Sequence, residues 1–285
     1  MSNMTLFLSI APASLLDWAG FPTPLFAMPL FALVLVGLIW AGSFFPRAEA
    51  LLRKGRALTR SGRPAEAEQC YRKALAKGSS VPVPVQVRLL VNLGGALMDQ
   101  GRYGESRESL NRALDLGDPT GSCNSFIAKL LLLQGTEPQK ALDMAEQAMQ
   151  IGGGAFRGGF LHDWGVRFGN LSRATQWAQK AWALALLRRE REARQGIEAA
   201  ANSVAAALAG TPNYRRTTPI YGPDYRTLVR LGVSEAQWTM GMALLAMNDT
   251  AQAAVHFRIA YETEAKGKYG KLASRQCEQL GVPVS

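Results

Sequence analysis

The sequence predicts an all-α protein in which one transmembrane helix precedes a solenoid of paired helices. Two features carry this prediction. No charged residue stands between Trp18 and Pro46, and beyond that stretch small and bulky residues recur at helical spacing around short turns that mostly contain glycine. A single helix pair cannot bury its apolar faces, so such pairs are expected to stack against neighbours of their own kind.

The composition agrees with closely packed helices. Of the 285 residues, 48% are apolar and 28 are glycine, which does not fit a disordered chain. The formal net charge of +10 suits positive flanks beside a membrane span or attraction to anionic lipid. Nucleic-acid binding is disfavoured, because no cluster combines basic and aromatic residues in the pattern of a known module.

The residues that usually carry chemistry form no recognisable site. The three cysteines lie far apart without a C-x-x-C pair, which disfavours a disulfide framework and mildly favours a reducing compartment. His162 and His256 are also far apart, so we expect no metal site. The glycine-rich run Gly152–Gly159 lacks the Lys-Ser/Thr of a nucleotide loop. The sequence therefore predicts no cofactor and no enzymatic activity.

The uncharged stretch predicts a membrane anchor. Residues 24–45 are long enough to cross roughly 30 Å of hydrocarbon as a helix. In a continuous helix Trp18 and Trp40 would lie about 33 Å apart, close to the separation of two interfacial aromatic belts. The run is too long for a signal peptide and no Lys or Arg precedes it. Its apolar residues also cover every face, unlike those of a buried core helix.

The N-terminal segment 1–23 is apolar but contains no second span. Its run Met4–Leu16 is too short to cross a bilayer. We expect it to lie at the interface, to pack against the membrane helices of a partner, or simply to contact lipid.

The charges that follow the span predict its orientation. Asp17 is the only charged residue before it, whereas six cations follow closely: Arg47, Arg53, Lys54, Arg56, Arg60 and Arg63. The positive-inside rule then places the repeats on the cytoplasmic side of the cell (inner) membrane. The same cations belong to the first helix pair, so an envelope-side location of the repeats remains the alternative.

The first helix pair spans Leu51–Leu75. Leu51, Gly55 and Leu58 share one helical face, and the run Ser61–Pro64 breaks the helix. Similar turns and small-residue stripes predict four further units. These are a second with its turn at 100–102, a third with Gly135 before Ala141, Ala145 and Ala148, a fourth with its turn at 168–170 before Ala174, Ala178 and Ala181, and a fifth with its turn at Asn248-Asp249.

These units set the predicted domain boundaries. Residues 47–188 hold units one to four, and residues 189–233 form a helical extension with the Pro-, Tyr- and Arg-containing loop 211–224. Residues 234–285 hold the fifth unit and a capping helix over Gly267–Leu280. A loop of this length is often functional, and we expect it to contact a partner or lipid, or to be an ordinary insertion.

The recurrence resembles the tetratricopeptide repeat family. A glycine recurs in the first helices, at Gly55, Gly94 and Gly241, and a bulky residue recurs in the second helices, at Tyr71, Leu110 and Phe257. Ala67, Ala174 and Ala253 open the second helices, and Ala74, Ala113, Ala148, Ala181 and Ala260 close them. The resemblance implies a right-handed α-solenoid whose first helices line a groove that holds an extended peptide or a partner helix.

Helical phase selects six polar residues that would face this groove: Arg56, Arg60, Arg88, Asn92, Lys129 and Arg167. Such a surface prefers an acidic segment, although the same charges would also serve solubility alone. Some relatives grip a C-terminal carboxylate, but here only Asn92 matches that set, because Leu52 and Phe126 replace polar members. We therefore expect a non-catalytic, membrane-anchored scaffold that binds partner proteins. The alternatives are an envelope-side repeat protein, or a basic face that binds anionic lipid or nucleic acid.

Overall fold

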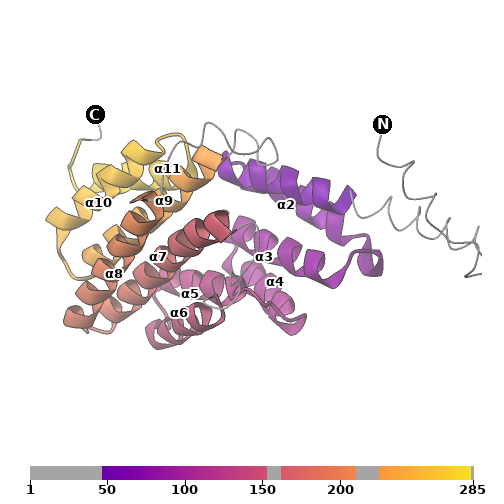
Figure 1. Cartoon of the computed structure of the whole chain (residues 1–285), viewed down its shortest axis with the longest axis horizontal. Coiled ribbons are helices and arrows are strands. Elements are labelled where there is room, and N and C mark those ends of the chain that lie inside the picture. The colour runs from indigo at the N-terminus through magenta and orange to yellow at the C-terminus, as the bar shows by residue number, and fades with distance from the viewer. Residues whose placement is uncertain (1–46, 153–161, 210–224, 284–285) are drawn as a thin grey trace, which may run out of the picture. The chain divides into compact units, whose positions relative to one another are not determined.

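The computed structural model describes residues 47–152, 162–209 and 225–283, and in these ranges every regular element is a helix (Figure 1). A first helix covers residues 47–60. It is followed by α2 (Pro64–Leu75), a short 3-10 helix η3 (Gly78–Ser80), α3 (Val83–Asp99), α4 (Tyr103–Asp115), α5 (Ser122–Gln134), α6 (Pro138–Gly152), α7 (His162–Leu186), α8 (Glu190–Ala209), α9 (Tyr225–Ala246), α10 (Thr250–Thr263) and α11 (Lys268–Gln279).

Consecutive helices pack as pairs. The pairs are helix 47–60 with α2, α3 with α4, α5 with α6, α7 with α8, and α9 with α10. The first helices of successive pairs also contact one another, α3 with α5, α5 with α7 and α7 with α9. Helix 47–60 joins this row through contacts with α3. The predicted all-α stack of helix pairs is therefore confirmed for the described residues.

Glycines in three first helices allow the close approach that the sequence predicts. A Cβ added to Gly55 would lie 2.3 Å from the Tyr71 ring, and one added to Gly241 would lie 2.5 Å from the Phe257 ring. At Gly94 the nearest atom would be Cγ of Leu110, at 2.7 Å. Real side chains cannot approach so closely, so the small residue is what permits each pair to pack.

The turn inside each pair contains one residue with left-handed backbone angles. In the first three pairs this residue is Gly62, Gly101 or Gly135. In the last two pairs it is Arg188 (φ 62°) and Asn248 (φ 60°). The left-handed region is comfortable for glycine, tolerable for asparagine and costly for arginine. The common geometry shows that five pairs use the same kind of turn with different residues.

The predicted fourth unit is wrong in its turn. The segment 168–170, expected to separate two helices, lies inside the continuous helix α7. The alanines expected in a second helix, Ala174, Ala178 and Ala181, are fully buried in this first helix of the pair. Its partner is α8, which the sequence analysis assigned to an extension. Gly196 of α8 lies against Ala181, so the glycine is a point of close helix contact.

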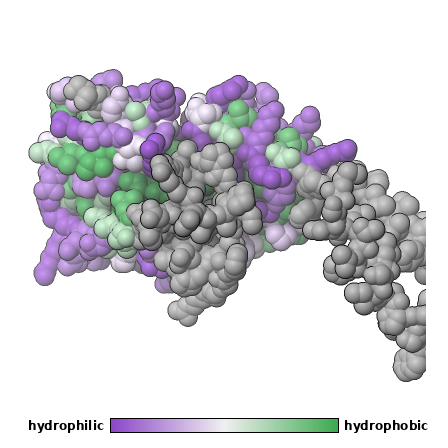
Figure 2. Space-filling view, turned by 45° about the horizontal axis from the view of Figure 1, so that its top comes forward, coloured by the Kyte–Doolittle hydropathy of each residue, from purple (hydrophilic) through white to green (hydrophobic). Residues whose placement is uncertain are grey.

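The predicted capping helix lies among the described residues, whereas the predicted membrane span does not. The capping helix expected near the C-terminus is α11, which packs on α10 and α9. The proposed span 24–45, Trp18, Trp40 and the loop 211–224 lie outside the described residues. Among the helices that are described, none has the length and apolarity needed to cross a membrane. On the face in Figure 2, hydrophilic residues dominate and apolar residues form separate patches.

Candidate partner-binding groove

The row of first helices lines two neighbouring cavities. The first, which we call the arginine cavity, has a volume of about 340 Å³ and is lined by Arg56, Pro84, Val87, Arg88, Val91, Asn92, Asp118, Pro119, Thr120, Ser122 and Phe126. The second, which we call the hydroxyl cavity, measures about 250 Å³ and is lined by Thr120, Ser122, Ser125, Phe126, Leu171, Ser172, Thr175, Gln176, Gly232 and Glu235. Three residues, Thr120, Ser122 and Phe126, belong to both, so the two cavities are adjacent, and we refer to them together as the groove.

The arginine cavity brings together three of the six predicted site residues. Nε of Arg56 donates a hydrogen bond to Oδ1 of Asn92 at 3.4 Å, across helix 47–60 and α3. The amide nitrogen of Asn92 donates to the main-chain carbonyl of Arg88 at 2.6 Å, one helical turn earlier. The guanidinium of Arg88 pairs with Glu49 of the first helix. The structure therefore brings these three predicted residues together at one cavity.

Apolar side chains complete this cavity. Val87 and Val91 are one helical turn apart on α3 and only 4% and 6% exposed. Phe126 of α5 lines the same space and its ring packs where Gly95 lacks a side chain. The cavity thus offers cations beside an apolar wall, a combination that suits a segment with an acidic and an apolar side chain.

The cations of the arginine cavity influence one another. Burial lowers the pKa of Arg56, and the nearby positive charges of Arg88 and Arg60 lower it further, while Glu49 opposes them. An arginine side chain nevertheless stays protonated at neutral pH. Arg56 is therefore a partly desolvated cation in a positive environment, which an incoming carboxylate would stabilise.

Asp118 adds a negative charge to the same cavity, and its carboxylate caps the start of α5. Its carboxylate accepts hydrogen bonds from the main-chain nitrogens of Cys123 at 2.7 Å and Thr120 at 2.9 Å, at the start of α5. Burial alone would raise the pKa of Asp118, but the hydrogen bonds from Thr120 and Cys123 lower it overall. The residue closes a helix end, and the negative charge that it keeps offsets part of the positive charge of Arg56 and Arg88.

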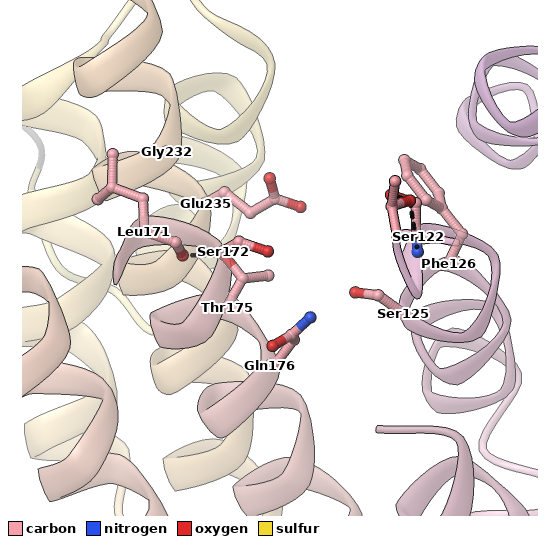
Figure 3. A pocket seen from close by; sticks show the side chains of 10 residues that line it. Ser122, Ser125, Phe126, Leu171, Ser172, Thr175, Gln176, Gly232 and Glu235 are labelled. Carbon is pink, nitrogen blue, oxygen red and sulfur yellow. Dashed lines mark hydrogen bonds between the residues drawn. The ribbon is translucent and has the colours of Figure 1, made fainter. Parts of the chain in front are cut away.

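The hydroxyl cavity has a different chemistry. Figure 3 shows Ser122, Ser125 and Phe126 of α5 on one side, facing α7 and Glu235 of α9 on the other. The hydroxyl of Thr175 donates to the carbonyl of Leu171 at 3.2 Å. That of Ser125 donates to the side-chain oxygen of Gln179 at 3.0 Å. Hydroxyls, one amide and one carboxylate make up its polar lining.

Lys129 is not available to an acidic partner, contrary to the sequence prediction. Its side chain is 5% exposed, and Nζ lies 2.7 Å from a carboxylate oxygen of Glu235. The hydroxyl of Tyr269 in α11 contacts both groups, and Nζ also lies 4.2 Å from the centre of the Tyr269 ring. Burial lowers the pKa of Lys129, and the charge of Glu235 opposes that effect. The lysine is part of an internal ion pair.

This ion pair belongs to a larger contact that ties α11 to earlier helices. Lys268, next to Tyr269, pairs with Asp99 at the end of α3. Trp238 of α9 packs between Trp182 and Tyr269, with ring centroids 5.9 Å and 5.8 Å apart. The residues that meet here are separated by up to 169 positions in the sequence. No local spacing could have revealed them.

The two remaining predicted groove residues are Arg60, which is not among the residues that line either cavity, and Arg167. Arg60 lies one turn after Arg56 on helix 47–60, is half-buried, and acts on the pKa of Arg56. Arg167 lies in α7, but its side chain is outside the described part of the chain. Val87, Val91 and Glu235 were not among the residues predicted to face the groove. The apolar pair could have been found, because it shares the helical face of Arg88.

Residues with catalytic potential are accounted for by packing. Within the described ranges, no group of three or more His, Cys, Asp or Glu side chains could hold a metal ion. Nδ1 of His256 lies 2.6 Å from the side-chain oxygen of Gln237, and burial lowers the pKa of His256. Burial also raises the pKa of the Cys123 thiol.

Comparison with known proteins supports the repeat assignment. Residues 44–119, which cover the first two helix pairs, match the tetratricopeptide repeat family. A tetratricopeptide repeat protein from Parabacteroides merdae, solved as a crystal structure, aligns over 83% of this chain and 99% of its own, with 16% identity and a TM-score of 0.33. The search of curated proteins finds no match. The predicted resemblance is thus confirmed for the segment that contains Arg56, Arg88 and Asn92.

Proposed function

We propose that this chain is a non-catalytic, membrane-anchored adaptor that binds an acidic and partly apolar segment of a partner protein in the arginine cavity. The observation that carries the proposal is the meeting of Arg56, Arg88 and Asn92 beside Val87 and Val91. They come from the segment that matches the repeat family, whose members generally mediate contacts between proteins.

The energetics favour such a ligand over a purely charged one. An exposed ion pair contributes little, because solvent screens it and both side chains lose freedom. Arg56 is instead partly desolvated before a ligand arrives, and the half-buried ring of Phe126 in the same cavity releases water when an apolar group covers it. A ligand with one carboxylate next to one aliphatic or aromatic side chain would satisfy both parts of the cavity.

A selection experiment tests this function directly. We would select a random displayed peptide library on the full chain and determine the enriched residues. The expected result is enrichment of Asp or Glu beside an apolar residue. The Arg56→Glu variant should lose that acidic preference or invert it, whereas Arg112→Glu should leave it unchanged. Arg112 is an exposed cation on α4 that lines neither cavity. Equal enrichment on both variants would refute the proposed site.

The membrane part of the proposal rests on the uncharged stretch 24–45 and the cations that follow it. It places the repeats on the cytoplasmic side. The three native cysteines are buried, so they are poor probes of topology. A cysteine introduced at Glu108, which is exposed on α4, should resist a membrane-impermeant thiol reagent in intact cells and react after permeabilisation. Labelling in intact cells would establish the envelope-side alternative.

One observation favours lipid over nucleic acid as a second contact. Arg47, Arg53 and Lys54 are exposed on helix 47–60 and form no ion pair within the described residues. They directly follow the proposed span, where anionic headgroups would attract them. Replacing all three with glutamine should weaken binding of the chain to anionic vesicles and leave its binding to neutral vesicles unchanged. An equal loss of binding to anionic and neutral vesicles would show that these three cations make no electrostatic contribution to membrane binding.

A further inference from the structure

The hydroxyl cavity differs from the arginine cavity in carrying no uncompensated charge. Glu235 is the one charged residue among the described side chains that line it. Its carboxylate is held by Nζ of Lys129 at 2.7 Å and by the hydroxyl of Tyr269. Because the charge of Lys129 balances this carboxylate, the pair offers no net charge to attract an ion of either sign. The cavity therefore disfavours charged groups of either sign.

The lining also has hydrogen-bonding capacity that the chain does not use. Gln176 is 6% exposed, and within the described residues its Nε2 donates to the carbonyl of Ala148 at the long distance of 3.4 Å. Its amide oxygen is left for another donor. Figure 3 shows the Gln176 amide and Ser125 on opposite sides of the same space, with Ser172 and Thr175 close by. Polar groups held in this way favour a ligand that completes their hydrogen bonds.

The size and position of the cavity indicate what completes them. At about 250 Å³ it is smaller than the usual site of a drug-sized molecule, and fits one residue of a bound segment. It shares Thr120, Ser122 and Phe126 with the arginine cavity. A segment held at Arg56 therefore continues past Phe126 directly into the hydroxyl cavity.

We propose that the hydroxyl cavity is a second subsite of the groove, which selects one neutral amide or hydroxyl side chain (Asn, Gln, Ser or Thr) of the bound partner segment. This inference rests on the proposed function, because it places the second residue beside the acidic one. The partner motif then has an acidic residue with an apolar neighbour at one end, and a neutral polar residue at the other.

The test uses the same peptide selection with two further variants of the full chain. In the double variant Thr175→Val and Gln176→Met, the cavity keeps its volume but loses the hydroxyl and the amide on its α7 side. Thr239→Val is the matched control, because Thr239 is also buried and makes the same bond to the carbonyl four residues earlier, yet lines neither cavity. Thermal unfolding of each variant checks that it folds.

The wild type and the control should enrich a neutral polar residue at a fixed distance from the acidic one. Changing that residue to leucine in a selected peptide should weaken binding about tenfold, the effect of one or two neutral hydrogen bonds. The double variant should show less than about a twofold difference. Acidic enrichment without a neutral polar position, or with Lys or Arg there, would overturn this inference and leave the proposed function standing. Absence of any acidic enrichment would overturn the proposed function itself.

Discussion

Replacing Glu235 with glutamine is expected to destabilise the chain by about 3 kcal/mol, the lower end of the range for breaking a buried ion pair. The Lys129 ammonium lies 2.7 Å from the carboxylate and its side chain is only 5% exposed. With an effective dielectric constant of about 20, the direct attraction at that distance is roughly 6 kcal/mol. Glutamine still accepts a hydrogen bond and relieves the desolvation of one charge, so about half of this attraction is lost as stability.

The matched substitution Lys129→Met should cost less, about 1 kcal/mol. Methionine fills the volume of the lysine stem without burying a charge, and Glu235 is 29% exposed and can be rehydrated. The double variant should resemble Lys129→Met alone, which gives a coupling energy of about 2 to 3 kcal/mol between the two positions.

Thermal unfolding followed by circular dichroism measures these effects. For a chain of this size, 3 kcal/mol lowers Tm by about 6 to 12 °C. The control is Glu108→Gln, which changes an exposed carboxylate that forms no ion pair in the described structure and should stay within about 0.5 kcal/mol. If Glu235→Gln shifts Tm no more than this control, then the buried pair does not stabilise the fold.

A pH dependence provides an independent check on the same variant. Burial lowers the pKa of Lys129 in the folded chain, and loss of Glu235 should lower it further. The unfolded lysine titrates near pH 10.4. Between the two pKa values the unfolded state binds more protons, so the stability of Glu235→Gln should rise with pH. A variant whose stability is flat or falls over that interval would contradict a buried, uncompensated Lys129.

Three further changes test the repeat geometry and a helix end. Gly94→Ala should destabilise the chain by about 1 to 3 kcal/mol, because a Cβ there would lie 2.7 Å from the side chain of Leu110. Gly104→Ala is the control, since its Cβ would meet nothing within 4 Å, and it should be neutral or stabilising. Equal Tm shifts for the two variants would refute the close packing. Arg188→Gly should raise the free energy of unfolding by roughly 0.5 kcal/mol, because glycine adopts the left-handed backbone angles of this position without strain. Arg112→Gly, inside α4, should lower it by about 1 kcal/mol. Changes of the same sign for both variants in denaturant unfolding would refute backbone strain at Arg188. The pKa of Asp118 is lowered in the folded chain, so its contribution to stability is complete above about pH 4 and is lost below it. Asp118→Asn should therefore reduce the loss of stability at acid pH. An unchanged acid limb would show that Asp118 does not contribute to the acid dependence of stability.

The first two turns could be predicted because glycine marks them, whereas the turn after α7 could not. Gly62 and Gly101 occupy left-handed positions, and a glycine beside a helical stripe is a readable signal. The corresponding position after α7 is Arg188, which carries no such signal. Gly169, inside α7, looked like a turn residue instead. Within the described residues no neighbour packs closely against it, so this glycine serves no close helix contact, and it marks no boundary.

The same contrast between local and distant contacts explains which residues of the candidate groove could be predicted from the sequence. Arg56, Arg88 and Asn92 were predicted together because each lies on one face of a first helix, and adjacent pairs repeat that face. Lys129 obeys the same periodicity, yet Tyr269 and Glu235 of later helices contact it. Helical phase predicts which way a side chain leaves its own helix. It contains no information about a helix 140 positions later that folds back to cover it.

The contact that removes Lys129 from the groove also determines the character of the hydroxyl cavity. Without Lys129 and Tyr269, Glu235 would present a full negative charge to that space, and the groove would attract a cation at one end and an anion at the other. With them, the groove changes from cationic beside Arg56 to neutral beside Glu235. In the proposed binding mode this gradient favours one direction of the segment, because reversing the segment would place its acidic residue next to the Glu235 carboxylate and its neutral residue next to Arg56. If the proposed groove binds its segment in this way, the long-range ion pair contributes to ligand selection as well as to stability.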